Sequence, residues 1–287
     1  MREVVYAGPM KNYPRAVSHS ANNRPLDGAG GTAGGIQSVA RALGILELFG
    51  ERREVLTTNE VAALTNLNRG TAYRFCQTLR NLGYLEEIRQ STFRPGLKVL
   101  SLAQAALGGR EIVDMAHPRL QQLRHDAGET VNFALPDQHE VVYVARLLND
   151  DLLALRLVVG SRLPIVSSSL GRAILAFLPE DRVDDILARS DFEALTEHSL
   201  TDRAQIEEKL SSVRELGYAF NDQEVAIGVR GIAAPVLSAQ GHAIAAVNLS
   251  IARPVGDDEV TNRLAPMLLA AAADISERAR GIVGLSD

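Results

Sequence analysis

Basic and polar side chains share one face of a short helical pattern near residue 70. Arg69, Tyr73, Arg74, Gln77 and Arg80 lie opposite the apolar positions of the same stretch. Arginine donates to guanine edges and to phosphates, and glutamine pairs with adenine, so this combination suits the major groove of DNA. Small neighbouring residues would let the helix enter the groove deeply. We therefore take this face as a candidate recognition surface.

The adjacent residues supply the elements that would position this face. Thr57-Thr58-Asn59-Glu60 reads as a capping box that starts a first short helix. Asn68 is a good N-cap for the second helix, because its side chain can accept from an orphan amide. Gly83 is expected to end the second helix in the left-handed conformation. The second helix is expected to bury Ala72, Phe75, Cys76, Leu79 and Leu82.

A leading helix and a basic hairpin complete the pattern of a winged helix-turn-helix. Ile36–Phe49 reads as the leading helix and residues 84–94 as the hairpin, or wing. An ordinary helical hairpin with a solvated face is the alternative, but it does not require this order of cap, break, helix, glycine and hairpin. The leading helix is expected to bury Val39, Leu43, Leu46 and Phe49, and the next one Val61, Ala62 and Leu64. The candidate DNA contacts are Gln37, Ser38, Arg41, Thr58, Asn68, Arg69, Gly70, Thr71, Tyr73, Arg74, Gln77, Arg89 and Arg94.

Charge is distributed unevenly along the 287 residues, whose formal net charge is −5. Residues 1–35 carry +2, residues 36–98 carry +3 and residues 99–287 carry −10. A basic head on an acidic body fits a protein that binds DNA through the head alone. The single cysteine, Cys76, falls on a core-facing stripe and predicts a buried thiol, with no disulfide framework. Without an apolar run of membrane length or a secretory signal, we expect a cytoplasmic protein.

The order of patterns divides the chain into four parts. Residues 1–35 lack periodicity and end in a glycine-rich run, so we expect a disordered tail or a misassigned start. Residues 36–95 form the DNA-binding domain and residues 96–127 a helical linker. A helical linker transmits orientation better than a flexible one. Residues 128–287 form the body, which we expect to bind an effector and to carry the oligomerisation surface.

The body reads as an α/β module built on an antiparallel sheet. Its strands and helices do not alternate strictly, which excludes a TIM barrel and a Rossmann unit. Strands are expected over 130–135, 140–148, 152–158, 218–221, 232–237 and 242–251. Helices are expected over 169–178, 180–189, 202–216 and 257–280. The sequence therefore predicts an α+β chain of two domains.

Several of these motifs together resemble the IclR family of bacterial transcriptional regulators. The resemblance covers about residues 36–280 and rests on the head, on residues 114–120 and 160–173, and above all on Gly217–Glu224 with Gly228–Val236. It implies a GAF-like effector domain, homodimers that usually pair as dimers of dimers, and a pseudo-palindromic double-stranded DNA operator. Arg162-Leu163-Pro164, followed by residues 167–172, is similar to the branch that controls aromatic catabolism. That branch responds to protocatechuate, 4-hydroxybenzoate and catechol-pathway compounds.

The resemblance also implies an effector pocket. Backbone amides at the start of the 169–178 helix would hold a carboxylate, polar side chains would fix hydroxyls, and apolar ones would line an aromatic ring. Asn221 stands where the family often has an acid, and Gly231 where it often has a cysteine, so we expect a larger, less polar pocket. The effector is then a small organic acid, aromatic or related, and bulkier than a keto acid. The implied pocket residues are Leu152, Leu163, Ser169, Leu170, Asn221, Val229, Gly231, Asn248 and Ser250.

Three arginines of the body have two interpretations each. Arg162 and Arg172 can pair with an anionic effector, but we favour an exposed loop residue for the first and a structural partner for the second. For Arg230 we favour an ion pair with Asp222 or Glu224 over a ligand role.

No catalytic or metal chemistry is indicated. The serines at 167–169 lack the G-x-S-x-G elbow, and the six histidines show no metal-binding spacing. We expect no enzyme activity, no cofactor and no metal ion. Three functions remain: a ligand-responsive DNA-binding regulator, a constitutive DNA binder whose body only oligomerises, and a GAF-type sensor or enzyme with a vestigial head. Polar residues in the pocket and the basic head favour the first.

Overall fold

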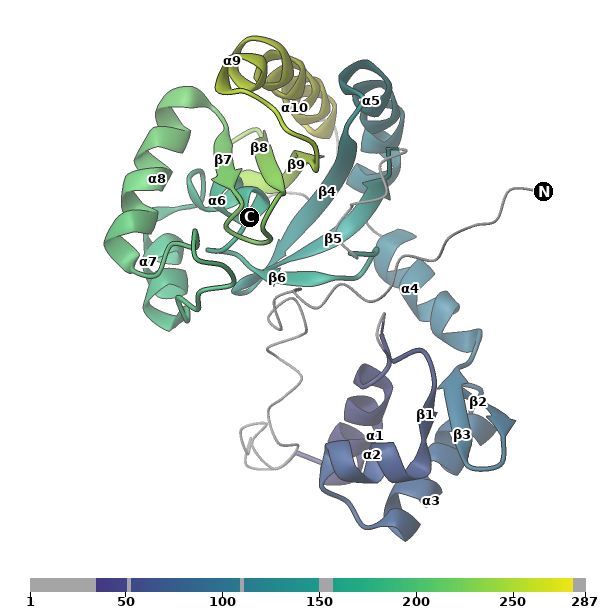
Figure 1. The fold of residues 1–287 in the computed structure, drawn as a ribbon. Coiled ribbons are helices and arrows are strands. Elements are labelled where there is room, and N and C mark those ends of the chain that lie inside the picture. Colours follow the sequence, from purple (N-terminus) through teal and green to yellow (C-terminus); the bar gives the residue numbers. More distant parts are fainter. Residues whose placement is uncertain (1–34, 51–52, 109–110, 150–156, 281–287) are drawn as a thin grey trace, which may run out of the picture. The chain divides into compact units, whose positions relative to one another are not determined.

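The computed structural model describes residues 35–50, 53–108, 111–149 and 157–280 (Figure 1). The described chain separates into two compact units at residues 111 and 112. The tail expected over 1–35 lies outside the described residues apart from its last position. The same holds for most of the strand expected over 152–158, and Leu157 and Val158 are not in a strand.

The N-terminal unit, called the head here, is a winged helix-turn-helix. Its small sheet has the order β1-β3-β2, and all pairs are antiparallel. This confirms the fold expected for the head, including the hairpin of the wing. Its elements are α1 (Gln37–Glu47), β1 (Leu56–Thr57), α2 (Thr58–Thr65), α3 (Arg69–Asn81), β2 (Leu85–Arg89), β3 (Thr92–Pro95) and α4 (Lys98–Gly108).

Helix starts and ends in the head follow from their capping residues. The capping box at Thr57 and Glu60 is complete, because each side chain bonds the other's backbone amide. The Asn68 side chain accepts from the Thr71 amide at 2.9 Å and starts α3. Gly83, at φ 84°, ends it: its amide bonds the Arg80 carbonyl and the next amide bonds that of Leu79. These local predictions are confirmed.

The buried stripe of the head differs from the expected one at four leucine and valine positions. Val39, Leu43, Leu64 and Leu82 are exposed by 41% to 55%. In α1 the residue that packs in the core is instead Ile45, which is fully buried. Periodicity identified the helices correctly, but it assigned part of an exposed apolar surface to the core. The core consists of Ile45, Leu56, Val61, Ala72, Cys76, Leu79, Leu85 and Phe93.

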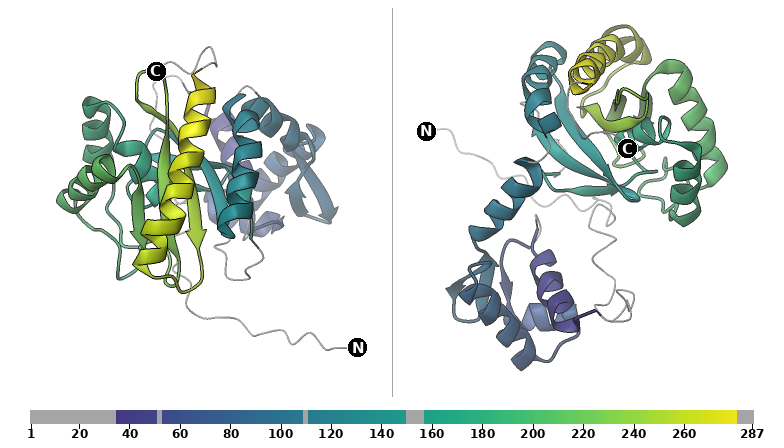
Figure 2. Two further views of the ribbon diagram at one scale, coloured as in Figure 1. Left: turned by 90° about the horizontal axis from the view of Figure 1, so that it is seen from above. Right: turned by 180° about the vertical axis from the view of Figure 1, so that it is seen from behind.

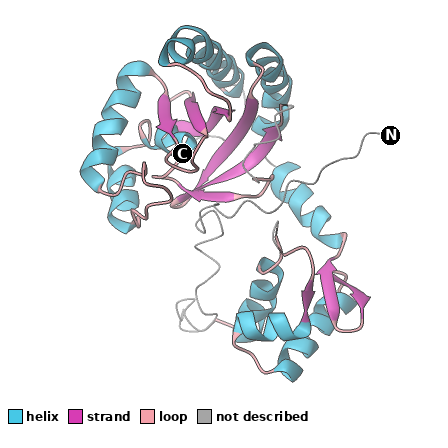
Figure 3. Cartoon of the chain, viewed as in Figure 1, coloured by secondary structure: helices cyan, strands magenta, loops and turns pink. Residues whose placement is uncertain are grey.

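The second unit, called the body here, is built on one six-stranded antiparallel sheet of order β6-β5-β4-β9-β8-β7. Its mixed helix and strand content is seen in Figure 3. The strands are β4 (Thr130–Asp137), β5 (Glu140–Leu147), β6 (Arg162–Pro164), β7 (Ala219–Asp222), β8 (Arg230–Leu237) and β9 (Ala243–Ile251). The helices are α5 (Glu111–Ala127), α6 (Ser169–Leu175), α7 (Glu180–Arg189), α8 (Arg203–Leu216), α9 (Asp257–Glu259), η3 (Val260–Leu264) and α10 (Ala265–Ala279).

Helices cover both faces of this sheet. Helices α5 and α10 lie side by side over one face (Figure 2), and Arg119 of α5 approaches Asp274 of α10 at 3.9 Å. Helix α6 packs on the other face, against β8 and β9, with α7 and α8 beyond it. The two helices of the expected linker therefore separate: α4 belongs to the head and α5 to the body.

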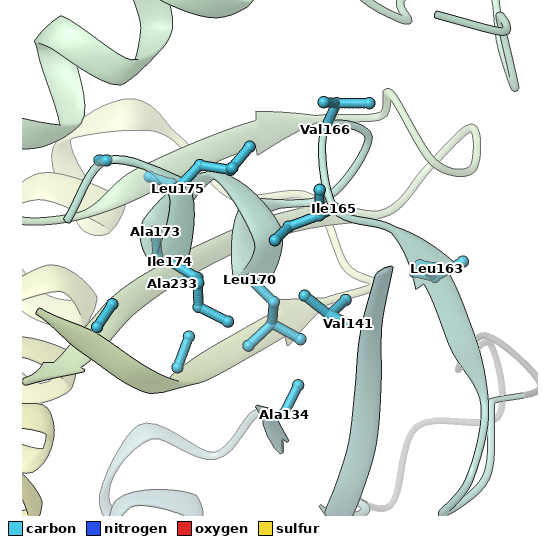
Figure 4. Packing of buried hydrophobic residues seen from close by; sticks show 14 of the residues in the cluster. Ala134, Val141, Leu163, Ile165, Val166, Leu170, Ala173, Ile174, Leu175 and Ala233 are labelled. Atoms are coloured by element: carbon cyan, nitrogen blue, oxygen red, sulfur yellow. The ribbon is translucent and has the colours of Figure 1, made fainter. Parts of the chain in front are cut away.

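The largest core of the body surrounds α6. Leu170, Ile174 and Leu175 of this helix belong to one buried cluster with Leu163 and Ile165, and each is at most 1% exposed. Figure 4 shows Ile165 beside α6 and Leu163 further out on β6. The C-terminal helix expected over 257–280 is continuous, but it contains a π-helical turn at Val260–Leu264. Such turns are rare within helices and often lie near functional sites.

Candidate nucleic-acid interface and ligand pocket

The exposed face of α3 contains most of the residues expected there, but Gln77 is partly buried. Arg69, Gly70, Tyr73 and Arg74 are all exposed, and Tyr73 reaches 41%. Ala72 and Cys76 face the opposite way and are fully buried. Burial raises the pKa of the Cys76 thiol to about 11, so this residue is part of the core and not of the surface. The arrangement presents two guanidinium groups and a phenol on one side of a helix.

Gln77 is tied to the wing. Its side-chain nitrogen donates to Glu87 at 3.0 Å, and its oxygen accepts from Arg80 at 2.8 Å. Glu87 also accepts from the Ser91 amide at the tip of the wing, and the bonds from Gln77 and Ser91 lower the pKa of this carboxyl group. Gln77 thus connects α3 to the wing, a role that the sequence pattern did not indicate.

The remaining expected contacts fall into two groups. Gln37, Ser38 and Arg89 are exposed, and so is Arg94, which forms an ion pair with Glu86 at 2.9 Å. Asn68 is also exposed. The second group is partly buried and consists of Arg41 and Thr71.

Thr58 does not reach the surface. Its side chain is 1% exposed, and its hydroxyl donates to the carbonyl of Ser91 at 3.3 Å. It holds the start of α2 against the wing, so the expectation that it contacts DNA was wrong. The capping motif placed this threonine at a helix start, but a helix start in a packed unit is not necessarily exposed.

A pocket opens in the body between α6 and the sheet. The space between its walls and just outside its mouth amounts to about 390 Å³, part of which is open solvent. Seven of the nine residues implied by the family resemblance meet there: Leu163, Ser169, Asn221, Val229, Gly231, Asn248 and Ser250. Of the other two, Leu152 lies outside the described residues. Leu170 is not among the residues that line the pocket and packs in the core around α6 (Figure 4), so its expected place in the pocket was wrong.

Seven further residues line the pocket. Apolar walls come from Leu157 and Val225, and burial raises the pKa of the Tyr143 phenol. The sequence could have indicated these pocket residues through polar side chains within otherwise apolar strands, such as Asn132 in β4. The complete additional set is Asn132, Tyr143, Arg146, Leu157, Ser168, Val225 and Arg230.

A row of polar side chains forms the floor of the pocket. Arg146 Nη1 donates to Asn132 Oδ1 at 3.0 Å, and Asn132 Nδ2 donates to Asn248 Oδ1 at 2.7 Å. Asn248 Nδ2 then donates to Ser169 Oγ at 3.2 Å. Arg146, Asn132 and Asn248 are register partners on β5, β4 and β9, so antiparallel pairing brings them together on one face. We call these four residues the polar row.

Two further pocket residues, Asn221 and Gly231, are explained by their close contacts. Asn221 Nδ2 donates to the Ser167 carbonyl at 3.2 Å, and its Oδ1 accepts from the Glu224 amide. Gly231 leaves space, because a Cβ atom there would approach Ser169 Oγ at 3.1 Å and Asn248 Nδ2 at 3.2 Å. The glycine therefore enlarges the pocket next to the polar row.

The three arginines of the body are settled by their contacts. Arg172 is 1% exposed and binds both carboxylate oxygens of Glu224, which confirms its structural role. Arg230 binds Asp222 through two nitrogens, at 2.8 and 3.1 Å, as expected. Arg162 is not a loop residue: it lies in β6 and binds Glu140 and Asp137.

The start of α6 is less open to a carboxylate than expected. The helix has seven residues, and the Ser168 hydroxyl already accepts from the Gly171 amide at 3.1 Å. In the described ranges, no three histidine, cysteine or acidic side chains gather as a metal site would require. Within the same ranges, no helix has both the length and the apolar character needed to cross a membrane.

Both units match family models. Residues 38–89 match the IclR helix-turn-helix domain, and residues 104–277 match the C-terminal domain of the bacterial transcriptional regulator IclR. The chain belongs to the IclR family, and it is a ligand-responsive DNA-binding transcriptional regulator.

Its relatives include regulators of aromatic metabolism. It is 33% identical to the Pca regulon regulatory protein of Pseudomonas putida, over 85% of this chain and 84% of that one. It is 32% identical to the p-hydroxybenzoate hydroxylase transcriptional activator of Acinetobacter baylyi, over 82% and 85%. An IclR homologue from Microbacterium hydrocarbonoxydans, solved with 4-hydroxybenzoate, shares the fold with a TM-score of 0.75 at 22% identity, over 85% of this chain and all of that one.

Proposed function

We propose that this regulator senses a small aromatic or related organic acid in the pocket between α6 and the sheet. The observation that carries the proposal is the meeting of seven implied residues in one cavity with a polar floor and apolar walls. Two relatives named for aromatic pathways support this effector class. A catabolic operon is the corresponding target, and the cytoplasm the corresponding compartment. The proposal includes no catalytic step.

We infer that α3 enters the major groove of a double-stranded operator. Arg69, Gly70, Tyr73 and Arg74 form the exposed face of α3, and Arg89 extends it along the wing. The other contacts in this proposal are Gln37, Ser38, Arg41, Asn68, Thr71 and Arg94. Gln77 contributes by positioning the wing, since its amide is already bonded on both sides.

A second copy of the chain is the expected partner of the head. Large apolar side chains are exposed on α1 and at α4, which is unusual for a surface that stays in water. They are Ile36, Val39, Leu43, Leu97, Leu100 and Leu102, each exposed by 52% or more. A dimer would present two α3 helices to a pseudo-palindromic operator, and dimers of dimers follow the family pattern. A head that stays monomeric by light scattering at micromolar concentration would contradict this arrangement.

A ligand screen tests the effector class. The purified chain is melted with benzoate, 4-hydroxybenzoate, protocatechuate, catechol, pyruvate and glyoxylate, because a ligand that binds the native state raises the melting temperature. We expect aromatic acids to give the larger shifts. Gly231→Val fills the space beside Ser169 and is expected to abolish them. Gly256→Val is the matched control, since a Cβ atom there meets open space. Shifts with the keto acids alone would refute the aromatic class.

DNA binding is tested on genomic fragments that the wild-type protein selects. Arg74→Ala is expected to weaken binding to most sequences if the guanidinium contacts phosphate, and Arg69→Ala to relax base preference at one position. Arg189→Ala, an exposed arginine of α7, serves as the control for lost charge. Gel shifts at fixed salt, repeated with the effector, also measure how far the effector changes operator affinity. Unchanged affinity and discrimination in both α3 variants would refute the assignment of this face.

A further inference from the structure

The polar row has a single direction. Arginine carries only donors, so the contact with Arg146 requires the oxygen of the Asn132 amide to face it. Asn132 therefore donates to Asn248, which in turn donates to Ser169. The far end agrees, because Asn248 Nδ2 also donates to the Leu249 carbonyl at 3.1 Å. Each residue of the row therefore donates a hydrogen bond to the next, in the order Arg146, Asn132, Asn248 and Ser169.

Ser169, the last residue of the row, has its hydroxyl proton available for donation. A serine hydroxyl has one proton and two acceptor sites, and the N–H of Asn248 occupies an acceptor site of Ser169. Within the described ranges, no protein group accepts the Ser169 proton. That proton is directed to whatever occupies the pocket, next to the space left by Gly231. The floor of the pocket thus offers an O–H to a ligand acceptor.

Burial strengthens the hydrogen bonds of the polar row. Asn132 is 2% exposed, and Asn248 and Ser169 are 5% exposed. Hydrogen bonds in a low-dielectric interior polarise one another, and a bond to a charged group is stronger than a neutral one. The guanidinium at one end therefore increases the donor strength of the hydroxyl at the other, two amide groups away.

We propose that Arg146 is a positioning residue that makes the pocket select an acceptor-bearing organic anion, acting through Asn132 and Asn248 on the Ser169 hydroxyl. The inference rests on the proposed function, because it specifies how that same pocket recognises its ligand. It predicts that the carboxylate of the effector lies at Ser169, next to the space left by Gly231.

Benzoate and benzamidine are the probes. They have the same shape, but the carboxylate only accepts hydrogen bonds, whereas the amidinium only donates them. Isothermal titration of the full-length chain gives the affinity ratio of the two. Ser169→Ala is expected to lower the ratio of benzoate to benzamidine affinity by about tenfold or more, the value of one charge-assisted hydrogen bond. Arg146→Met and Asn132→Leu are expected to lower the ratio in the same direction but by less, because each bond of such a chain strengthens its neighbour by only about 10–30%. Ser169→Ala removes only one oxygen and serves where the larger changes impair folding.

A double variant separates action through the row from direct contact. Arg146→Met combined with Asn132→Leu is expected to lower the ratio no further than either change alone, since both interrupt one chain of bonds. Arg162→Met is the charge control: it removes an arginine of β6 that lies outside the pocket, and it should leave the ratio unchanged.

The outcomes are distinguishable. A wild-type chain that binds neither probe nor any other aromatic acid would overturn the proposed function and this inference with it. Binding of benzoate with a wild-type ratio in Asn132→Leu, but a reduced ratio in Arg146→Met, would overturn the inference alone and make Arg146 a direct counter-ion. Multiplied effects in the double variant would do the same.

Discussion

Arg172 and Glu224 offer a quantitative test of how the body is held together. Their guanidinium and carboxylate form two bonds, of 2.6 and 3.0 Å, and the side chains are 1% and 8% exposed. Arg172 also donates to the Phe220 carbonyl at 3.0 Å. The pair therefore joins α6 to β7 and to the segment that follows it. We consider Arg172→Met, Glu224→Leu and the double variant.

The expected cost follows from what each change leaves buried. Arg172→Met strands the Glu224 carboxylate, and losing one partner of a buried ion pair costs about 3–5 kcal/mol of unfolding free energy. Glu224→Leu strands the guanidinium, although the Phe220 carbonyl still accepts from it. The double variant leaves only the two carbonyls to which Arg172 donates, those of Phe220 and Val166, without this donor, at about 1–3 kcal/mol for each group left unsatisfied. It should therefore be more stable than Arg172→Met alone.

Urea unfolding followed by circular dichroism measures these free energies. Amide hydrogen exchange of peptides from α6 and β7 assigns the transition to the body. Because two units are present, equal transitions by both probes are required before a single free energy is quoted. If the cost of the double variant equalled the sum of the two single costs, the pair would not be coupled and the reasoning would be refuted.

Three further predictions concern other parts of the chain. Cys76 should not react with a disulfide reagent at pH 8 in the native state, because burial holds its pKa near 11; rapid labelling without denaturant would contradict its place in the core. Glu259 accepts from Arg253 and Arg263, which lower its pKa from 4.5 to about 2. This depressed pKa stabilises the fold above pH 4.5, and the contribution is lost as the pH falls toward 2. The stability difference between wild type and Glu259→Gln should shrink over that window, and a constant difference would exclude the ion pairs as its source. Gly171→Ala places a Cβ atom 1.7 Å from the carbonyl oxygen of Ile165. Thermal melting should show a loss of about 3 kcal/mol or more in the free energy of unfolding. A wild-type melting temperature would show that the backbone at Ile165 moves away freely.

Local chemistry explains what was predictable from the sequence. The capping box at Thr57, the N-cap at Asn68 and the left-handed Gly83 each depend on residues within a few positions. The helix Glu180–Arg189 matched its expected bounds; it has no side-chain cap, but Glu180 and Asp181 lie in its first turn, where negative charge is favourable. The pocket residues were found through the family resemblance, which carries three-dimensional information that periodicity lacks.

The errors share a different cause. Whether an apolar residue is buried depends on what packs against it, so Val39 and Leu43 continued the helical period of α1 yet remained exposed. The predicted locations of Thr58 and Leu170 were wrong for the same reason, because residues distant in sequence pack against them. The partners of Asn132 and Gln77 come from other elements, 116 and 10 residues away. Such pairs require the fold before they are recognised.

Strand β9 provides a route from the pocket to the helix that enters the body. Asn248 lies in β9, and Arg253 follows that strand and donates to Glu129, just beyond the end of α5, at 2.8 Å. Arg263 holds the end of α5 from the C-terminal helix, by donating to the Ala127 carbonyl at 3.3 Å. From these contacts we predict that a ligand that shifts β9 also shifts the end of α5.

The effect on DNA is limited by the difference in ligand affinity between the two arrangements, typically about 1–3 kcal/mol. Arg253→Met is expected to reduce the change in operator affinity on adding the effector, while effector binding to the free protein stays near the wild-type value. Because coupling is reciprocal, the effector should then bind the free and the DNA-bound protein with more similar affinities. Titrating the effector against both forms measures this, and an undiminished difference would exclude Arg253 from the route.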